Sequence, residues 1–211
     1  ILPSSETPTG NIEGYHDAVK CADLFRKNAD LIEGIIIILP NFGDELGVVN
    51  TINLSGLKVP VLVQACDDDN DKVDVKSRRD AFCGKLSVCN NFYQYGIKFT
   101  DTTYHTYSLD SKEFTADILR FSAICRVVKG LKNLRVGAIG TRPAGFQTMR
   151  SSEKLLQQAG ITVVPVDMSE IIAAAEKIKD SEAVVTERIK AILAYGNCKT
   201  TSKDKIARQA R

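Results

Sequence analysis

The fold of this chain is decided by two apolar runs, Gly34-Ile-Ile-Ile-Ile-Leu39 and Val59-Pro-Val-Leu-Val-Gln-Ala-Cys66. Short, continuous runs of this kind are typical of strands that are covered on both faces, as in a parallel sheet. Each run leads directly into a polar loop, Pro40–Glu45 after the first and Asp67–Asp71 after the second. Open α/β sheets bind ligands beyond the carboxyl ends of their strands. The sequence therefore predicts a binding crevice formed by these two loops.

The rest of the chain alternates between helical and strand-like patterns, which indicates βαβ units. We expect helices at 14–28, 46–54, 77–95, 110–129, 146–159, 169–179 and 181–195, and further strands at 97–100, 134–140 and 161–166. The fold class is therefore α/β, with an open, mostly parallel sheet and helices on both faces, as in Rossmann-like or flavodoxin-like three-layer sandwiches. We place an N-terminal α/β domain at residues 1–195 and the start of a linker or next domain at 196–211.

Two helices carry apolar residues at helical spacing, and this predicts which faces are buried. In the helix at 77–95, the residues Phe82, Leu86, Cys89 and Tyr93 predict one buried stripe. In the helix at 110–129, the predicted stripe is formed by Ile118, Phe121, Cys125 and Val128.

Composition excludes several classes of function. Lys and Arg number 28 against 26 Asp and Glu, a net charge of +2, which gives no reason to expect nucleic acid or an anionic membrane as a partner. No apolar run is long enough to span a bilayer. The N-terminus lacks the basic and apolar regions of a secretory signal, so we expect a cytoplasmic protein. The six cysteines form no C-x-x-C pair and are interpreted as buried thiols, with Cys198 the most reactive.

The segment Gly137-Ala-Ile-Gly140-Thr-Arg-Pro-Ala-Gly145 suggests a dinucleotide-binding turn between a strand and a helix. Its spacing is G-x-x-G-x-x-x-x-G, however, and the close glycine pair that admits a pyrophosphate is missing. A plain strand-to-helix turn is the simpler interpretation. Arg142 at its tip is suited to contact an anion or a sugar hydroxyl.

The acidic run Asp67–Asp71 is not an EF-hand, because Lys72 and Arg78 occupy the positions that need Gly and Glu. It is either a solvated turn or a loop that presents Asp67 or Asp68 to a ligand.

The two histidines form no zinc motif. We expect His16 on an exposed helix surface, and His105 either packed or in contact with substrate. The sequence contains no G-x-S-x-G elbow or Walker loop, so the residues alone give no complete catalytic set.

Four segments together resemble the N-terminal region of the L-fucose isomerase and L-arabinose isomerase superfamily, most closely its bacterial L-fucose isomerase-like proteins. They are Leu39–Glu45, Val61–Asp68, Asp80–Gly96 and Val136–Phe146. The resemblance implies a metal-dependent aldose–ketose isomerase, usually with manganese, that works through an enediol. In the family the metal ligands and the two proton-relay carboxylates lie outside the matched region. No catalytic or metal-binding residue is therefore expected in this chain, and the chain alone is expected to be inactive.

The resemblance also implies a homo-oligomer in which this domain lends sugar-recognition residues to a neighbouring subunit. The loop concerned is similar to Asn41–Glu45, which assigns Phe42 as a stacking surface for a small sugar. The possible hydroxyl partners are Asn41, Asp44, Glu45, Gln64, Asp67 and Arg142; for Asp44 and Glu45, a helix N-terminus remains the alternative role.

The ends of the chain also bear on this resemblance. The chain opens on Ile1 without Met and closes on Lys203–Arg211 without a helix stop signal, so both ends are interpreted as cut. The resemblance implies a further strand and helix before Ile1 and further domains after the matched region.

Two other functions stay open from sequence. One is a stand-alone sugar-binding module, which the missing signal peptide disfavours. The other is a nucleotide-dependent oxidoreductase domain, which the glycine spacing disfavours.

Overall fold

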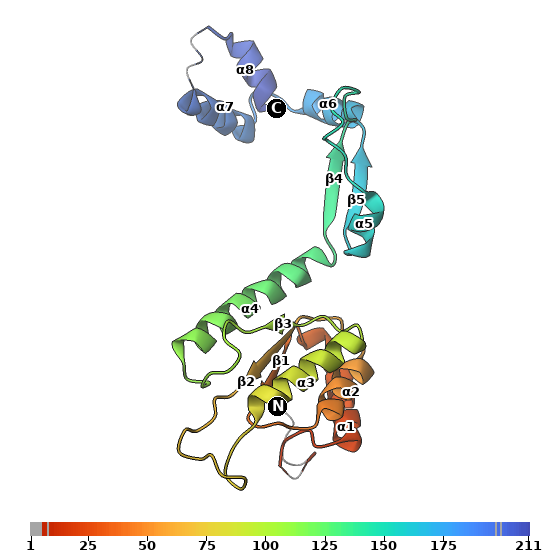
Figure 1. The fold of residues 1–211 in the computed structure, drawn as a ribbon. Helices are drawn as coiled ribbons and strands as arrows, with labels where there is room; N and C mark the ends of the chain where they lie inside the picture. Colours follow the sequence, from red (N-terminus) through yellow and green to blue (C-terminus); the bar gives the residue numbers. More distant parts are fainter. Residues whose placement is uncertain (1–5, 8, 197, 199) are drawn as a thin grey trace. The chain divides into compact units, whose positions relative to one another are not determined.

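The computed structural model describes residues 6–7, 9–196, 198 and 200–211. Within it the chain forms two compact units, unit 1 at Ile1–Lys132 and unit 2 at Asn133–Arg211 (Figure 1). The division falls at 132/133, and the predicted domain of residues 1–195 stays a prediction. None of the described helices combines the length and the apolar character needed to cross a bilayer.

Unit 1 contains a three-stranded parallel sheet with the strand order β1-β2-β3. Its elements are α1 (Tyr15–Lys27), the 3₁₀ helix η1 (Ala29–Leu31), β1 (Ile35–Leu39), α2 (Glu45–Ser55), β2 (Val61–Ala65), α3 (Ala81–Gln94), β3 (Thr100–Asp101) and α4 (Lys112–Leu131). In the β1–β2 register, Ile35 lies opposite Val61 and Leu39 opposite Ala65. Both predicted strands of the fold-deciding stretch are therefore confirmed and paired.

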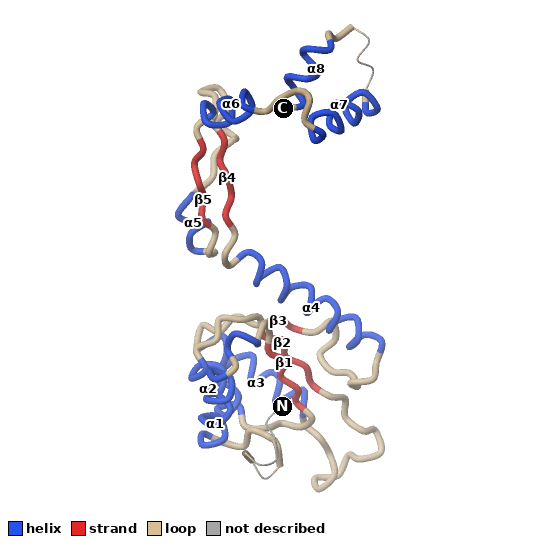
Figure 2. Tube along the Cα trace, turned by 180° about the vertical axis from the view of Figure 1, so that it is seen from behind, coloured by secondary structure: helices blue, strands red, loops and turns tan. Residues whose placement is uncertain are grey.

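Helices cover both faces of this sheet, as the figures show for unit 1 (Figures 1 and 2). Every residue of β2 is buried. On one face, Val61 and Val63 belong to the same apolar cluster as Val88 and Phe92 of α3. On the other face, Leu62 packs against α4. The predicted α/β class with a helix layer on each face is confirmed.

The prediction of the buried face was right for α4; for α3 it was wrong except at Cys89, which is half-buried and packs against the core cluster. In α4, Phe121 and Cys125 are buried as expected. In α3 the buried residues are Ala81, Gly84, Lys85, Val88 and Phe92. Phe82, Leu86 and Tyr93 are 41%, 56% and 82% exposed instead. The helix carries apolar residues on two adjacent faces, and packing against the sheet selects the face that also holds the small residues Ala81 and Gly84.

Unit 2 contains a two-stranded parallel sheet of β4 (Arg135–Ile139) and β5 (Thr162–Val166). Its helices are α5 (Glu153–Gln158), α6 (Met168–Lys177), α7 (Ala183–Tyr195) and α8 (Lys203–Ala210). Every residue of β4 is exposed. The helices α7 and α8 contact each other, and Val185, Ile206 and Ala207 are buried.

Two further expectations need correction. The helix expected at 146–159 is only the short α5, which begins at Glu153 after Ser152 caps it by accepting a hydrogen bond from Leu155 N. Among the six cysteines, all of which are free, Cys83 is exposed although its apolar neighbours predicted burial. It lies in the first turn of α3 beside Phe82, on the face that the core does not use.

Candidate functional site

The predicted crevice corresponds to the carboxyl edge of the sheet in unit 1. Because β1, β2 and β3 are parallel, the loops that follow them start from the same edge. These loops are residues 40–44 before α2, residues 66–80 before α3 and residues 102–111 before α4 (Figure 1).

The loop after β1 is held against the start of α3 by contacts at its tip. Asn41 Oδ1 accepts hydrogen bonds from Phe42 N at 2.8 Å and from Asp80 N at 2.9 Å. The backbone of Phe42 lies so close to Gly84 that a Cβ there would come within 2.2 Å of Phe42 O. Gly43 has φ +72°, a conformation that favours glycine. These contacts fix the backbone of Phe42 while its side chain stays 39% exposed.

Asp44 and Glu45 have structural bonds in addition to any role in binding. Asp44 is the N-cap of α2, and its Oδ1 accepts a hydrogen bond from Gly47 N at 2.7 Å. Glu45 lies in the first turn of α2, and its Oε2 accepts a hydrogen bond from Asn91 Nδ2 at 2.6 Å. The helix N-terminus proposed as an alternative for these carboxylates is therefore present. These bonds engage one oxygen of each carboxylate.

The other three predicted residues lie in three different environments. Gln64 is fully buried, and its Nε2 donates to Ala65 O and Tyr107 O, both at 2.8 Å. The bond to Tyr107 ties β2 to the loop after β3. Asp67 is exposed in the loop after β2. Arg142 belongs to unit 2, where its guanidinium donates to the carbonyls of Pro143 and Ala144. The structure thus places Asn41–Glu45 and Asp67 at one edge.

The acidic run after β2 is partly braced by basic side chains. Asp69 accepts a hydrogen bond from Arg79 at 2.7 Å and forms an ion pair with Lys72 at 3.1 Å. The bond from Arg79, followed by the one from Lys72, holds the pKa of Asp69 below its ordinary value. Asp67 and Asp68 remain exposed at the start of the loop.

Lys85 is a buried cation that the sequence did not reveal. Its side chain is 3% exposed, and its ammonium donates to Thr102 Oγ1 at 2.7 Å and to His105 O at 3.1 Å and pairs with Asp101 Oδ1 at 2.6 Å. These three contacts tie α3 to the end of β3 and to the loop after it. The ring of His105 lies against Phe82, with centroids 5.3 Å apart, so the packed interpretation of this histidine is the one observed.

Asp117 is a buried carboxylate that fixes the same loop from α4. Its side chain is 3% exposed; it accepts hydrogen bonds from Thr103 N and Thr103 Oγ1, both at 2.7 Å, and from Tyr107 OH, and it forms an ion pair with Arg120 at 3.2 Å. Burial by itself raises the pKa of Asp117, but these donors together hold it below its ordinary value. Burial, followed by the bond to Asp117, raises the pKa of Tyr107 to about 12.

The glycine-rich segment of unit 2 does not form a dinucleotide-binding turn. Strand β4 ends at Ile139 and Gly140 turns with φ +70°, but residues 141–152 are irregular and the next helix begins only at Glu153. A helix N-terminus, where a pyrophosphate would bind, does not follow the turn.

The described residues offer no cluster of metal ligands. In the ranges 6–7, 9–196, 198 and 200–211, no three His, Cys, Asp or Glu side chains converge so that they could hold a metal ion. The manganese that the family resemblance implies does not fit these residues.

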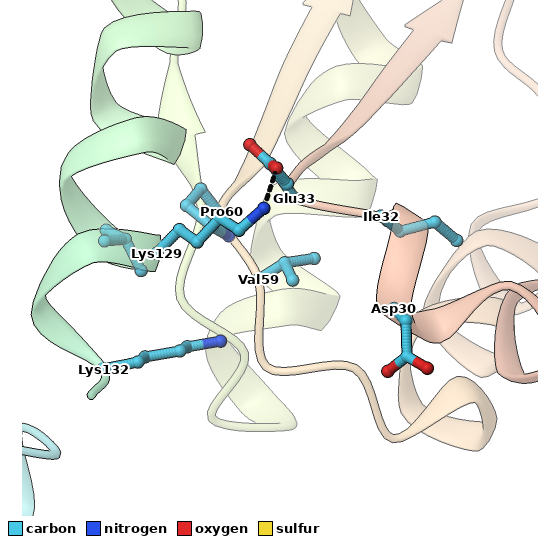
Figure 3. Close-up of a pocket in the computed structure, with 8 residues that line it drawn as sticks. Asp30, Ile32, Glu33, Val59, Pro60, Lys129 and Lys132 are labelled. Atoms are coloured by element: carbon cyan, nitrogen blue, oxygen red, sulfur yellow. Dashed lines mark hydrogen bonds and ion pairs between the residues drawn. The ribbon is translucent and has the colours of Figure 1, made fainter.

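Two cavities lie at the amino end of the sheet and not at the carboxyl edge. One, of about 80 Å³, lies between Val59 and Pro60 before β2, Glu33 before β1, and the last turn of α4, where Lys129 pairs with Glu33 (Figure 3). The other, of about 360 Å³, is lined mainly by apolar residues of α1 and β1. The first has room for only a few water molecules. We base the candidate site on the loops of the carboxyl edge.

Unit 1 is thus an open α/β domain with an exposed aromatic ring and several oxygen acceptors at the carboxyl edge of a parallel sheet, which is the arrangement of a ligand-binding domain of this fold class. The chain belongs to the family described as fucose/sulfoquinovose isomerase, N-terminal domain, whose match covers residues 1–132. The match ends at the residue where unit 1 ends. A comparison with curated proteins found no match. The resemblance predicted from the sequence is confirmed for residues 1–132, and with it membership of a family of sugar isomerases. The segment Val136–Phe146 lies outside the match, and its resemblance stays a prediction.

Proposed function

We propose that this chain is the sugar-recognition and oligomer-contact part of an aldose–ketose isomerase, and that the metal and the proton-relay carboxylates of the enediol reaction lie outside it. The family match over residues 1–132 supports the isomerase assignment. The observation that carries the recognition role is the loop Asn41–Glu45, which presents Phe42 from a fixed backbone at the carboxyl edge.

Phe42 supplies what a sugar-binding wall needs. The C–H face of a sugar packs on an aromatic ring, while its hydroxyls need acceptors nearby. At the same edge of the sheet, the carboxylates of Asp44, Glu45 and Asp67 are the available acceptors. Because Asn41 and Gly84 already fix the loop, little conformational entropy is lost when a sugar binds.

The contact with Phe42 is tested by saturation-transfer NMR of the 211-residue chain with L-fucose, L-arabinose and sulfoquinovose. We expect weak, millimolar binding with saturation passing from aromatic protons to at least one sugar. The substitution Phe42→Ala should abolish that signal. Phe146→Ala is the matched control, because Phe146 is also exposed but lies in unit 2. A signal that survives Phe42→Ala, or that depends on Phe146, would refute the recognition role.

The proposal that the catalytic groups lie outside this chain is tested by incubating the chain with manganese and the same sugars. We expect no conversion to ketose, because the described residues offer no metal site. Turnover by the isolated chain would contradict the assignment of the chemistry to another part of the enzyme. Micromolar sugar binding by the monomer in calorimetry would instead favour a stand-alone binding module.

A further inference from the structure

The loop after β3 is held in one conformation by two buried charged side chains from different helices. Lys85 of α3 donates a hydrogen bond to the carbonyl of His105. Asp117 of α4 accepts hydrogen bonds from Thr103 and Tyr107. Burying a charge costs free energy that its partners return only in part, so what the two charges secure is the conformation of the loop.

Two aromatic side chains reach solvent from this fixed loop. Tyr104 is 57% exposed and His105 is also exposed, although Thr102 and Tyr107 on either side of them are buried. Thr102 Oγ1 donates a hydrogen bond to Tyr104 O at 2.7 Å. The ring of His105 lies against the ring of Phe82, with centroids 5.3 Å apart. The exposed side chains are therefore carried by a backbone that is already in place.

The imidazole of His105 has hydrogen-bonding capacity that the fold does not use. Its printed contact with Phe82 is one between rings, and within the part of the chain that the structure describes neither ring nitrogen has a hydrogen-bond or ion-pair partner. A neutral imidazole offers one N–H donor and one acceptor nitrogen. A sugar hydroxyl both donates and accepts, so it can bind to either nitrogen.

His105 and Phe42 lie on two sides of the start of α3. Because β2 is the middle strand of the sheet, the loops after β1 and β3 flank the first turn of the helix that follows β2. The backbone of Phe42 lies against Gly84, and the ring of His105 lies against Phe82. Residues two apart in a helix point in roughly opposite directions, and the Cα atoms lie on a cylinder only about 5 Å across. A ligand that covers the start of α3 can therefore contact both loops.

We propose that His105 is a second sugar-binding residue, whose imidazole forms a hydrogen bond with a hydroxyl of the sugar that packs on Phe42. The inference rests on the recognition role proposed above and adds a polar contact to the aromatic one. In small-molecule sites, aromatic surface supplies contact area, while a few well-placed polar groups fix orientation and specificity. Phe42 has the first of these roles and His105 the second.

The contact is tested by NMR of the 211-residue chain with an isotope label on histidine only. The chain has 2 histidines, His16 and His105, so two sets of ring signals are expected, which His16→Gln assigns. The chain is titrated with L-fucose, L-arabinose and sulfoquinovose. The ring signals of His105 should shift with the sugar whose saturation signal depends on Phe42, and with the same dissociation constant. His16 is the internal control, because it is also exposed but belongs to α1, and its signals should not move.

The substitution His105→Phe separates hydrogen bonding from packing. The new ring can still pack on Phe82, so the thermal midpoint should stay that of the wild type. Sugar binding should weaken roughly 3–10-fold, the effect of losing one hydrogen bond. His105→Asn keeps a donor and an acceptor and should recover part of the affinity. The matched control, His16→Phe, should bind sugar as the wild type does.

His105 signals that stay unshifted at sugar concentrations that saturate the Phe42 contact would overturn the inference and leave the recognition role intact. Wild-type affinity of His105→Phe, or equal shifts of both histidines, would also overturn it. If no sugar contacts Phe42, the recognition role itself fails, and the assignment of His105 fails with it.

Discussion

Asp117 is a buried carboxylate that accepts three hydrogen bonds from the loop after β3. They come from the backbone N–H and the hydroxyl of Thr103 and from the hydroxyl of Tyr107, and the guanidinium of Arg120 forms an ion pair with the same carboxylate. These bonds hold the loop after β3 in place, and that loop in turn accepts bonds from Lys85 and Gln64. Asp117 therefore fixes the conformation of the loop after β3, which is one of the three loops at the carboxyl edge.

The substitution Asp117→Asn should destabilise unit 1 by about 1.5–3 kcal/mol, since it replaces an acceptor oxygen by an amide donor that faces the donors of Thr103 or Tyr107. Urea unfolding followed by circular dichroism measures the loss. The control is Asp110→Asn, because Asp110 is exposed and bonds only to Ser108 nearby. Equal stability of the Asp117 variant and the wild type would contradict this account.

The stability of unit 1 should depend on pH through the same residue, Asp117. The folded chain holds the pKa of Asp117 below its ordinary value, so the carboxylate contributes stability that is present above pH 4 and is lost as the pH falls through the folded pKa. As the pH falls below about 4, the free energy of unfolding of the wild type should therefore fall by more than that of Asp117→Asn.

At the scale of elements, the contact between α3 and the loop after β1 depends on one missing side chain. Gly84 lies in the middle of a helix, where glycine costs roughly 1 kcal/mol relative to alanine. Its Cα faces the backbone of Phe42, and no Cβ fits between them. A glycine inside a helical pattern is a signal of close packing, and here Gly84 marks the point where the loop after β1 packs against α3.

We therefore expect Gly84→Ala to destabilise the chain by about 1–3 kcal/mol and to displace Phe42, because the new Cβ would meet backbone that cannot rotate away. Gly130→Ala in α4 is the matched control. A Cβ at Gly130 meets nothing within 4 Å, so that substitution should stabilise by roughly 0.5–1 kcal/mol. Thermal unfolding and the NMR shifts of the Phe42 ring report both effects.

The sequence predicted the parts of this region that depend on apolar runs and caps. The strands at 34–39 and 59–66 and the loop that follows each were predicted correctly, because a short, continuous apolar run fits a strand that is buried on both faces of a parallel sheet. The buried face of α3 was missed, because both of its faces carry apolar residues and the small Gly84 decides between them. Lys85 was missed because a lysine at a core position looks like a solvent-exposed one in any pattern. Asp117 was missed because its pattern is that of an exposed acid, and the sequence does not show that the loop carrying Thr103 and Tyr107 folds back onto it.

At the scale of the whole molecule, the two units differ in how many apolar residues their sheets bury. Unit 1 has a buried central strand with clusters on both faces, while the β4 strand of unit 2 is exposed throughout. In β5 three of the five residues are half-buried and α5 contacts the strand, but none is fully buried, and a two-stranded sheet with so little buried surface is marginally stable by itself.

We expect a polypeptide of residues 1–132 to unfold cooperatively by heat, with a midpoint close to that of the corresponding transition in the full chain. Residues 133–211 alone should show a broad, weakly cooperative loss of structure. Calorimetry of the three polypeptides checks this. A single sharp transition that exists only in the full chain would contradict the autonomy of unit 1.

The amide oxygen of Asn41 accepts a hydrogen bond from the backbone N–H of Asp80, the residue before α3, and Gly84 of the same helix lies against the backbone of Phe42. The proposed sugar contact is therefore built at the junction of two elements of unit 1. A sugar that binds at this junction stabilises the folded state by mass action, so the thermal midpoint of unit 1 should rise with sugar concentration.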